Sequence, residues 1–333
     1  YQYTNLGDQY AGGTQEQPGE IKVNFIASSQ TAPSDSSTYK IPEGFKFGEE
    51  ELSGLWMGKF ETTGSMSAAC TDENCTTADI SIKPNLSSLR NQTVSSFFYA
   101  SRAMQNSTNA NKYGFDVIGN GTMDIHIAKK TEWGIAAYLS QSKYGKYGNP
   151  SYTGEEKQVA INNCTDFITG IGGDSVSADR TNTTCTTNTY ETEKGRAASS
   201  TGTIYGIYDM SGGGWDYVMG NYNHFSGQND IYHSGFSGPT GEGPAISRVA
   251  WPDSKYYDLY DSDIVETAYK DGDATYETWS WYSDYTDFIN SRFPWFALGG
   301  GLQHTFEAGV FANSINSGGY ANPYYATRYV VKP

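Results

Sequence analysis

The stretch TIYGIYDMSGGGWDYVMGNY, residues 203–222, is the part of the chain around which the rest is expected to be organised. It opens with β-branched and aromatic residues, which predicts a strand over residues 203–208. Three glycines follow at 212–214, and glycine tolerates a positive φ, so they predict a sharp corner or a close backbone approach. Trp215 comes next. Burying such a ring removes about 150–250 Å² from water, which favours a core position over a ligand platform.

Composition limits the classes of protein to which the chain can belong. It has 333 residues and a formal net charge of −15, enough for one large domain or two ordinary ones. The acidic balance argues against nucleic acid or an anionic membrane surface as the partner. Aromatic residues make up 15%, too many for a disordered chain. Abundant Tyr, Asn, Ser and Gly are typical of adaptable recognition surfaces and indicate a β-rich or loop-rich extracellular protein.

Neither a membrane helix nor an initiating methionine is visible in the sequence. No apolar run approaches the roughly 18 residues that a membrane helix needs. The chain starts with Tyr1. We therefore expect that an N-terminal signal or anchor segment was removed or that the chain was trimmed, and that this segment itself does not contact a membrane.

The four cysteines fall into two local pairs, Cys70 with Cys75 and Cys164 with Cys185. An even count at short spacings indicates disulfides and an oxidising compartment. Three connectivities are possible, and we predict the two local ones. Zinc is the alternative, but C-x4-C and C-x20-C without a nearby histidine is poor zinc spacing.

The chain divides into residues 1–40, an N-terminal linker or extended arm, and one domain over residues 41–333. A polar insertion at about 145–200 holds the second cysteine pair. Apolar residues at helical spacing predict helices over residues 87–104, capped by Ser87 or Ser88, and over residues 129–144. Strands are predicted where β-branched or aromatic residues cluster or alternate, at residues 21–26, 45–47, 55–61, 122–127 and 279–281.

The segment GIYDMSGGGWD, residues 206–216, resembles the G-x-x-D-M-x-G-N-x-W-E signature of the formylglycine-generating-enzyme (sulfatase-modifying-factor) family. Gly213 stands where that signature has Asn, and Asp216 replaces Glu. GLWMGKFETT at 54–63 and TEW at 131–133 resemble an early strand and a helix of the same family. The resemblance implies an α+β fold of C-type lectin type, loop-rich, with two helices flanking small antiparallel sheets.

The residues available for chemistry do not fit the activity of that family. Its enzymes oxidise a substrate cysteine with a C-terminal cysteine pair that binds copper, whereas no cysteine follows Cys185 here. Related thiol oxidases use a histidine-rich iron centre. His224 and His233 could share a metal or be ordinary loop residues. The acidic run 258–273 could bind Ca²⁺ or be a solvated loop. We expect no catalysis and no cofactor, with Ca²⁺ possible.

The last forty residues, PWFALGGGLQHTFEAGVFANSINSGGYANPYYATRYVVKP, alternate short framework pieces with polar or aromatic ones. This mosaic resembles the variable proteins of diversity-generating retroelements, which use the C-type lectin fold. Arg328-Tyr329 stands where their framework has G-F-R or S-F-R. Trp295 and Phe296 are expected in the core. The resemblance implies that the ligand-binding residues lie on turns between framework strands: Gln303, His304, Thr305, Glu307, Asn313, Ser314, Asn316, Tyr320, Asn322, Tyr324 and Tyr325.

These residues predict a non-catalytic recognition protein at the cell surface, on a pilus or on a virion, whose ligand is a protein or glycan on another cell or particle. Tyr offers large contact area at low rotamer cost, and Asn and Ser offer adaptable hydrogen bonds. The same residues could also be the ordinary surface of an aromatic-rich domain. Two other functions stay open: an oxidoreductase of the sulfatase-modifying-factor class with rebuilt metal chemistry, and a structural pilus or virion subunit.

Overall fold

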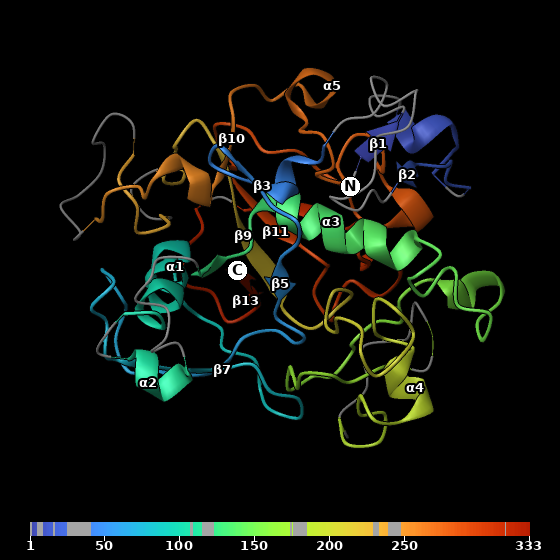
Figure 1. Ribbon diagram of the computed structural model, residues 1–333, viewed down its shortest axis with the longest axis horizontal. Helices are drawn as coiled ribbons and strands as arrows, with labels where there is room; N and C mark the ends of the chain where they lie inside the picture. Colours follow the sequence, from blue (N-terminus) through green and yellow to red (C-terminus); the bar gives the residue numbers. More distant parts are fainter. Residues whose placement is uncertain are drawn as a thin grey trace.

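The computed structural model describes residues 2–4, 9–15, 17–24, 41–106, 109–114, 123–173, 175, 185–228, 233–238, 248–316 and 318–333. Short helices and several small sheets are joined by long loops, which makes the fold mixed α+β (Figure 1). The helices are α1 Val94–Ala103, α2 Ala110–Tyr113, α3 Lys130–Gln141, α4 Glu193–Arg196 and α5 Val265–Ala268. The strands are β1 Gln2–Thr4, β2 Lys22–Asn24, β3 Lys46–Phe47, β4 Glu50–Glu51, β5 Trp56–Met57, β6 Thr63–Met66, β7 Ala78–Ser81, β8 Asp124–Ile127, β9 Trp215–Tyr222, β10 Asp258–Tyr260, β11 Trp295–Leu298, β12 Asn313–Asn316, β13 Tyr325–Thr327 and β14 Tyr329–Lys332.

The strand β9 is the centre of the largest sheet. On one side it pairs antiparallel with β11, which pairs in turn with β12. On the other side it pairs in parallel with β13 at its N-terminal end and with β10 at its C-terminal end. The sheet is therefore mixed, so the expectation of antiparallel pairing does not hold for β10 and β13. A second sheet has the order β5-β14-β8 and joins the end of the chain to its early part.

Both faces of β9 are buried, because successive side chains of a strand point to opposite faces. Trp215, Tyr217 and Met219 enter the core that contains the apolar face of α1. Val218 enters a second core, which contains α3. Figure 1 shows α1 to the left of β9 and α3 to its right. Trp215 is confirmed as a core residue.

Trp295 and Phe296, neighbours on β11, enter the two cores separately, and both are fully buried. The prediction of core positions for them is confirmed. The helix α1 begins at Val94 because the hydroxyl of Thr93 accepts the amide of Ser96 at 3.2 Å. The predicted start near residue 87 is therefore wrong.

Two predicted strands are not strands in the structure. Residues 203–208 form turns, and the strand starts only after the glycines. Trp281 lies in a short 3-10 helix, Trp281–Ser283, and packs edge-on against Phe311 with ring centroids 5.1 Å apart. Trp279 packs into the same core as Trp281, so their alternation does not mark two faces of a strand.

Part of the N-terminal segment packs against the domain. Gly19 donates its amide to Tyr10 O at 3.2 Å, which closes a compact loop, and Gln15 O accepts the amide of Tyr282 at 3.0 Å. Tyr10 and Ile21 pack against the core that contains α3. Parts of residues 9–15 and 17–21 are thus packed against the domain, whereas residues 25–40 lie outside the described part of the chain.

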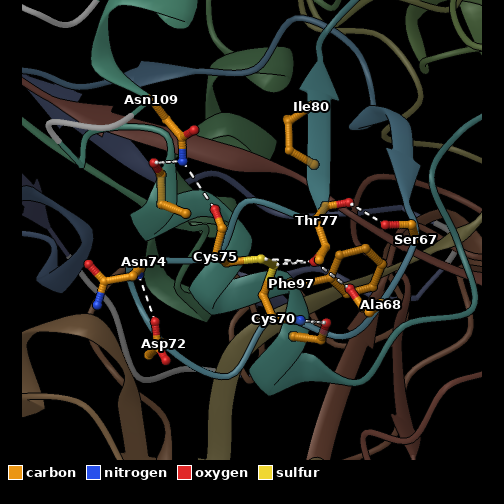
Figure 2. Close-up of a disulfide and its surroundings, with 12 residues drawn as sticks. Ser67, Ala68, Cys70, Asp72, Asn74, Cys75, Thr77, Ile80, Phe97 and Asn109 are labelled. Carbon is orange, nitrogen blue, oxygen red and sulfur yellow. Dashed lines mark hydrogen bonds between the residues drawn. A yellow bond between two sulfur atoms is a disulfide. The ribbon is translucent and has the colours of Figure 1, made fainter.

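Both predicted disulfides are present, Cys70–Cys75 and Cys164–Cys185, each with a Cα–Cα distance of 5.3 Å. Figure 2 shows the first beside Thr77, whose hydroxyl donates to Ala68 O at 2.9 Å. Disulfides persist in oxidising compartments, which fits an extracellular protein. No helix among the described residues is both long and apolar enough to cross a membrane.

Candidate functional site

The glycine corner that precedes β9 is built around a buried carboxylate. Gly212 and Gly213 have φ of +74° and +72°, a region that L-residues with a Cβ rarely adopt. Glu61 Oε1 accepts the amide of Gly214 at 2.9 Å. A Cβ built on Gly213 would lie 2.4 Å from the same oxygen. Position 213 therefore has to be glycine, because the carboxyl group of Glu61 occupies the space that a side chain would fill.

Three buried carboxyl groups lie near one buried guanidinium beneath this corner. Glu61, Asp209 and Asp216 are each no more than 2% exposed. Arg328 Nη2 lies 3.4 Å from Asp216 Oδ2. Burial raises the pKa of all three carboxyl groups, to about 7 for Asp216, and the charge of Arg328 opposes the rise. Burial therefore favours the protonated form of these groups more than it would for carboxyl groups in water.

Arg328 also hydrogen bonds to the backbone on two sides. Its Nη1 donates to Gly58 O at 2.7 Å and its Nη2 to Tyr208 O at 2.8 Å. The side chain is fully buried, with its guanidinium carbon 5.9 Å from the centroid of the Trp133 ring. Arg328 is therefore a framework residue that joins three distant segments.

Two predicted ligand residues lie against the first residues of β9. The ring of His304 packs edge-on against Trp215 with centroids 4.8 Å apart. Tyr325 is the strand partner of Trp215 and stacks on Tyr217 at 4.6 Å. The corner thus brings together residues 304 and 325, which the sequence separates by two framework segments.

The turn before β13 places further predicted residues on the same side. Asn322 Oδ1 accepts the amide of Tyr324 at 2.9 Å, and its Nδ2 donates to the hydroxyl of Tyr320 at 3.3 Å. Trp215 donates its amide to Tyr324 O at 2.9 Å. The Tyr324 side chain is 51% exposed. We use the name corner surface for the predicted residues grouped here: Gln303, His304, Thr305, Tyr320, Asn322, Tyr324 and Tyr325.

The other predicted residues lie elsewhere or inside. Asn313 and Asn316 belong to the strand β12 and are 1% and 4% exposed, so their expected place on exposed turns is wrong. Asn313 Nδ2 donates to Phe311 O at 2.8 Å, and Asn316 Oδ1 accepts the amides of the turn that follows it. Both satisfy backbone groups. Ser314 is half-buried on β12, and Glu307 O accepts the amide of Tyr285 at 2.8 Å.

The corner surface has neighbours that sequence reasoning missed. The ring of Phe167 lies 6.2 Å from that of Tyr324, and the guanidinium carbon of Arg90 lies 3.8 Å from the centroid of the Phe167 ring. Arg90 Nη1 donates to Pro323 O. Leu86 is 44% exposed, and its carbonyl oxygen accepts a hydrogen bond from the amide of Thr169. Phe167 lies three residues after Cys164, so the disulfide anchors its loop. This short spacing was the signal in the sequence that could have pointed to Phe167.

The two segments that could have bound a metal are engaged in other contacts. Asp258 Oδ2 accepts the amide of Thr131 at 2.7 Å, and Asp273 Oδ2 accepts that of Lys270 at 2.9 Å. Both carboxyl groups are buried, so the ends of the acidic run are not a solvated loop. His224 lies 2.9 Å from the hydroxyl of Tyr257. Within the described ranges, no three His, Cys, Asp or Glu side chains are arranged to hold a metal ion.

The chain matches no protein-family model and no curated protein.

Proposed function

We propose that this protein is a non-catalytic recognition protein that binds a protein or glycan of another cell or particle through the corner surface. The observation that carries the proposal is the convergence of His304 with the turn of Asn322 and Tyr324 around buried Trp215. Polar and aromatic side chains are half-exposed there, while the backbone beneath them is fixed by buried groups. Such a division is what a binding surface on a rigid scaffold requires.

The scaffold that we propose is of C-type lectin type. It is supported by the order of the elements, since α1 and α3 precede the corner and the chain ends on β14, beside the early strand β5. The proposed role as a variable protein of a diversity-generating retroelement rests on the mosaic of the last forty residues. Asn313 and Asn316 fall outside the proposed contact set because they are buried.

A binding screen with matched variants tests the function. Labelled protein is applied to a panel of bacterial cells and to purified surface proteins and glycans, and Tyr324→Ala is compared with wild type. Tyr205→Ala is the control, because Tyr205 is 89% exposed on a turn outside the corner surface. We expect Tyr324→Ala to weaken binding at least about tenfold, as for an aromatic hot spot, and Tyr205→Ala to leave it unchanged.

Three results would argue against the proposal. Binding that is equal for wild type and both variants would place the contact elsewhere. Stoichiometric copper or iron together with thiol oxidation would favour the oxidoreductase. Protection of Tyr324 from surface labelling in an assembled filament or particle would favour a structural subunit. Sequencing the flanking DNA for a reverse transcriptase and a template repeat tests the proposed variability separately.

A further inference from the structure

Arg90 lies at the edge of the corner surface in a fixed position. One face of its guanidinium covers the ring of Phe167, at 3.8 Å from the ring centroid, and Nη1 donates to Pro323 O. The next residue, Asn91, donates its amide to Asn322 O at 3.1 Å. The arginine is therefore fixed against the same turn that presents Tyr324. Its planar group is oriented before any ligand arrives.

No carboxylate of the described residues forms an ion pair with Arg90, although the chain has a net charge of −15. The buried arginines differ from the half-buried Arg90: Arg102 lies 2.6 Å from Asp124, and Arg328 lies 3.4 Å from Asp216. Burial lowers the pKa of Arg90, with Glu61 opposing through its charge at longer range. A partly desolvated cation without a bound anion is costly to hold, so the site favours an anion supplied from outside.

The hydrogen-bonding groups of Arg90 are only partly used. Its Nε is buried and has no hydrogen-bond partner among the described residues. Only Nη1 donates to protein, which leaves the Nη2 side of the planar fork for a ligand. A carboxylate is an anion that suits this open side, because its oxygen can accept an N–H of Nη2 in a charge-assisted hydrogen bond. The ring of Tyr324 packs at 6.2 Å from that of Phe167 and offers an apolar face beside the charge.

We propose that the corner surface binds a ligand carboxylate through Arg90, with an apolar part of the same ligand against Tyr324. This inference rests on the proposed function and specifies the chemistry of its ligand. The other role open to Arg90 is a purely structural one, joining the loop of Phe167 to the turn of Pro323. The two roles make different predictions about the charge of the ligand.

The test uses two small probes of nearly equal shape, phenylacetate and phenylacetamide, of which only the first is charged. Titration of the whole protein is followed by nuclear magnetic resonance at the arginine Nε–H signals and by calorimetry. We expect phenylacetate to bind at least about tenfold more tightly than phenylacetamide and to shift the Arg90 signal, with an affinity that falls as salt is added. Equal binding of both probes, or no binding of either, overturns the inference.

Variants distinguish the effect of the Arg90 charge from an effect on folding. Arg90→Gln should abolish the preference for phenylacetate, whereas Arg292→Gln should keep it. Arg292 is a matched control because it also covers a phenylalanine ring, at 5.3 Å from Phe293, but lies exposed elsewhere. Arg90→Lys keeps the charge and loses the planar fork, so we expect an intermediate preference. Thermal melts of each variant report whether it is folded, and the wild-type comparison of the two probes needs no variant.

The result also separates this inference from the proposed function. If a natural partner found in the screen binds Arg90→Gln as tightly as wild type, while Tyr324→Ala weakens it, the corner surface is the binding site and the carboxylate inference is wrong. If neither change affects binding of that partner, both proposals are wrong.

Discussion

Replacing Gly213 with alanine tests the physical reason for the glycine corner. Gly213 has a φ of +72°, and an added Cβ would lie 2.4 Å from Glu61 Oε1. That oxygen accepts the amide of Gly214 at 2.9 Å, and the Glu61 side chain is 1% exposed. The carboxyl group has to move, so the buried amide loses its acceptor.

The expected loss of stability has two parts. Holding an L-residue in the left-handed region costs about 1–2 kcal/mol, partly offset by about 0.4–1 kcal/mol because alanine restricts the unfolded chain. Leaving a buried donor without its acceptor costs about 1–3 kcal/mol more. We therefore expect Gly213→Ala to lower the free energy of unfolding by about 3 kcal/mol. It should also weaken ligand binding, because Leu302 donates its amide to Gly213 O at 2.9 Å and leads into His304.

Urea unfolding of wild type and variant at constant pH measures the loss as a shift of the midpoint. Gly154→Ala is the matched control. Gly154 also has a positive φ, +54°, but nothing lies within 4 Å of an added Cβ. We expect the control to lose about 1 kcal/mol. Equal losses for the two variants would refute the reasoning, because the contact with Glu61 would then contribute nothing.

Three further predictions concern the buried Asp216 and the two disulfides. Because burial raises the pKa of Asp216 from 3.8 to about 7, the folded protein keeps a proton that the unfolded chain has released, so stability is lost as pH rises through this window. Asp216→Asn should reduce that loss, so the urea midpoints of variant and wild type should diverge as pH rises from about 4 to about 7. Parallel pH profiles would contradict this. Replacing Cys164 and Cys185 with serine should cost about 3 kcal/mol, since the bond spans 21 residues, and should weaken binding by releasing the loop of Phe167. Breaking the Cys70–Cys75 bond, which spans 5 residues, should cost about 2 kcal/mol and leave binding unchanged.

Features that depend on neighbouring residues could be predicted from the order of residues alone. The short spacings predicted both disulfides, and the helical periodicity predicted α1 and α3, although the Thr93 cap placed the start of α1 later than expected. A tryptophan after three glycines predicted a corner with a buried ring. These features follow from local geometry and from the apolar character of single side chains, both of which are present in the order of residues.

Which residues meet at the site depends on contacts between distant segments. Glu61 lies more than 150 positions from Gly214 along the chain. No motif near Glu61 indicates that its carboxyl group fills the glycine corner. Asn313 and Asn316 of β12 are the same residue type as the Asn of an exposed turn, but the pairing of β12 with β11 buries them. Arg90 and Phe167 join the corner surface through contacts with the turn of Pro323. Burial and pairing between distant segments depend on how the whole chain packs, and no short window of sequence contains that information.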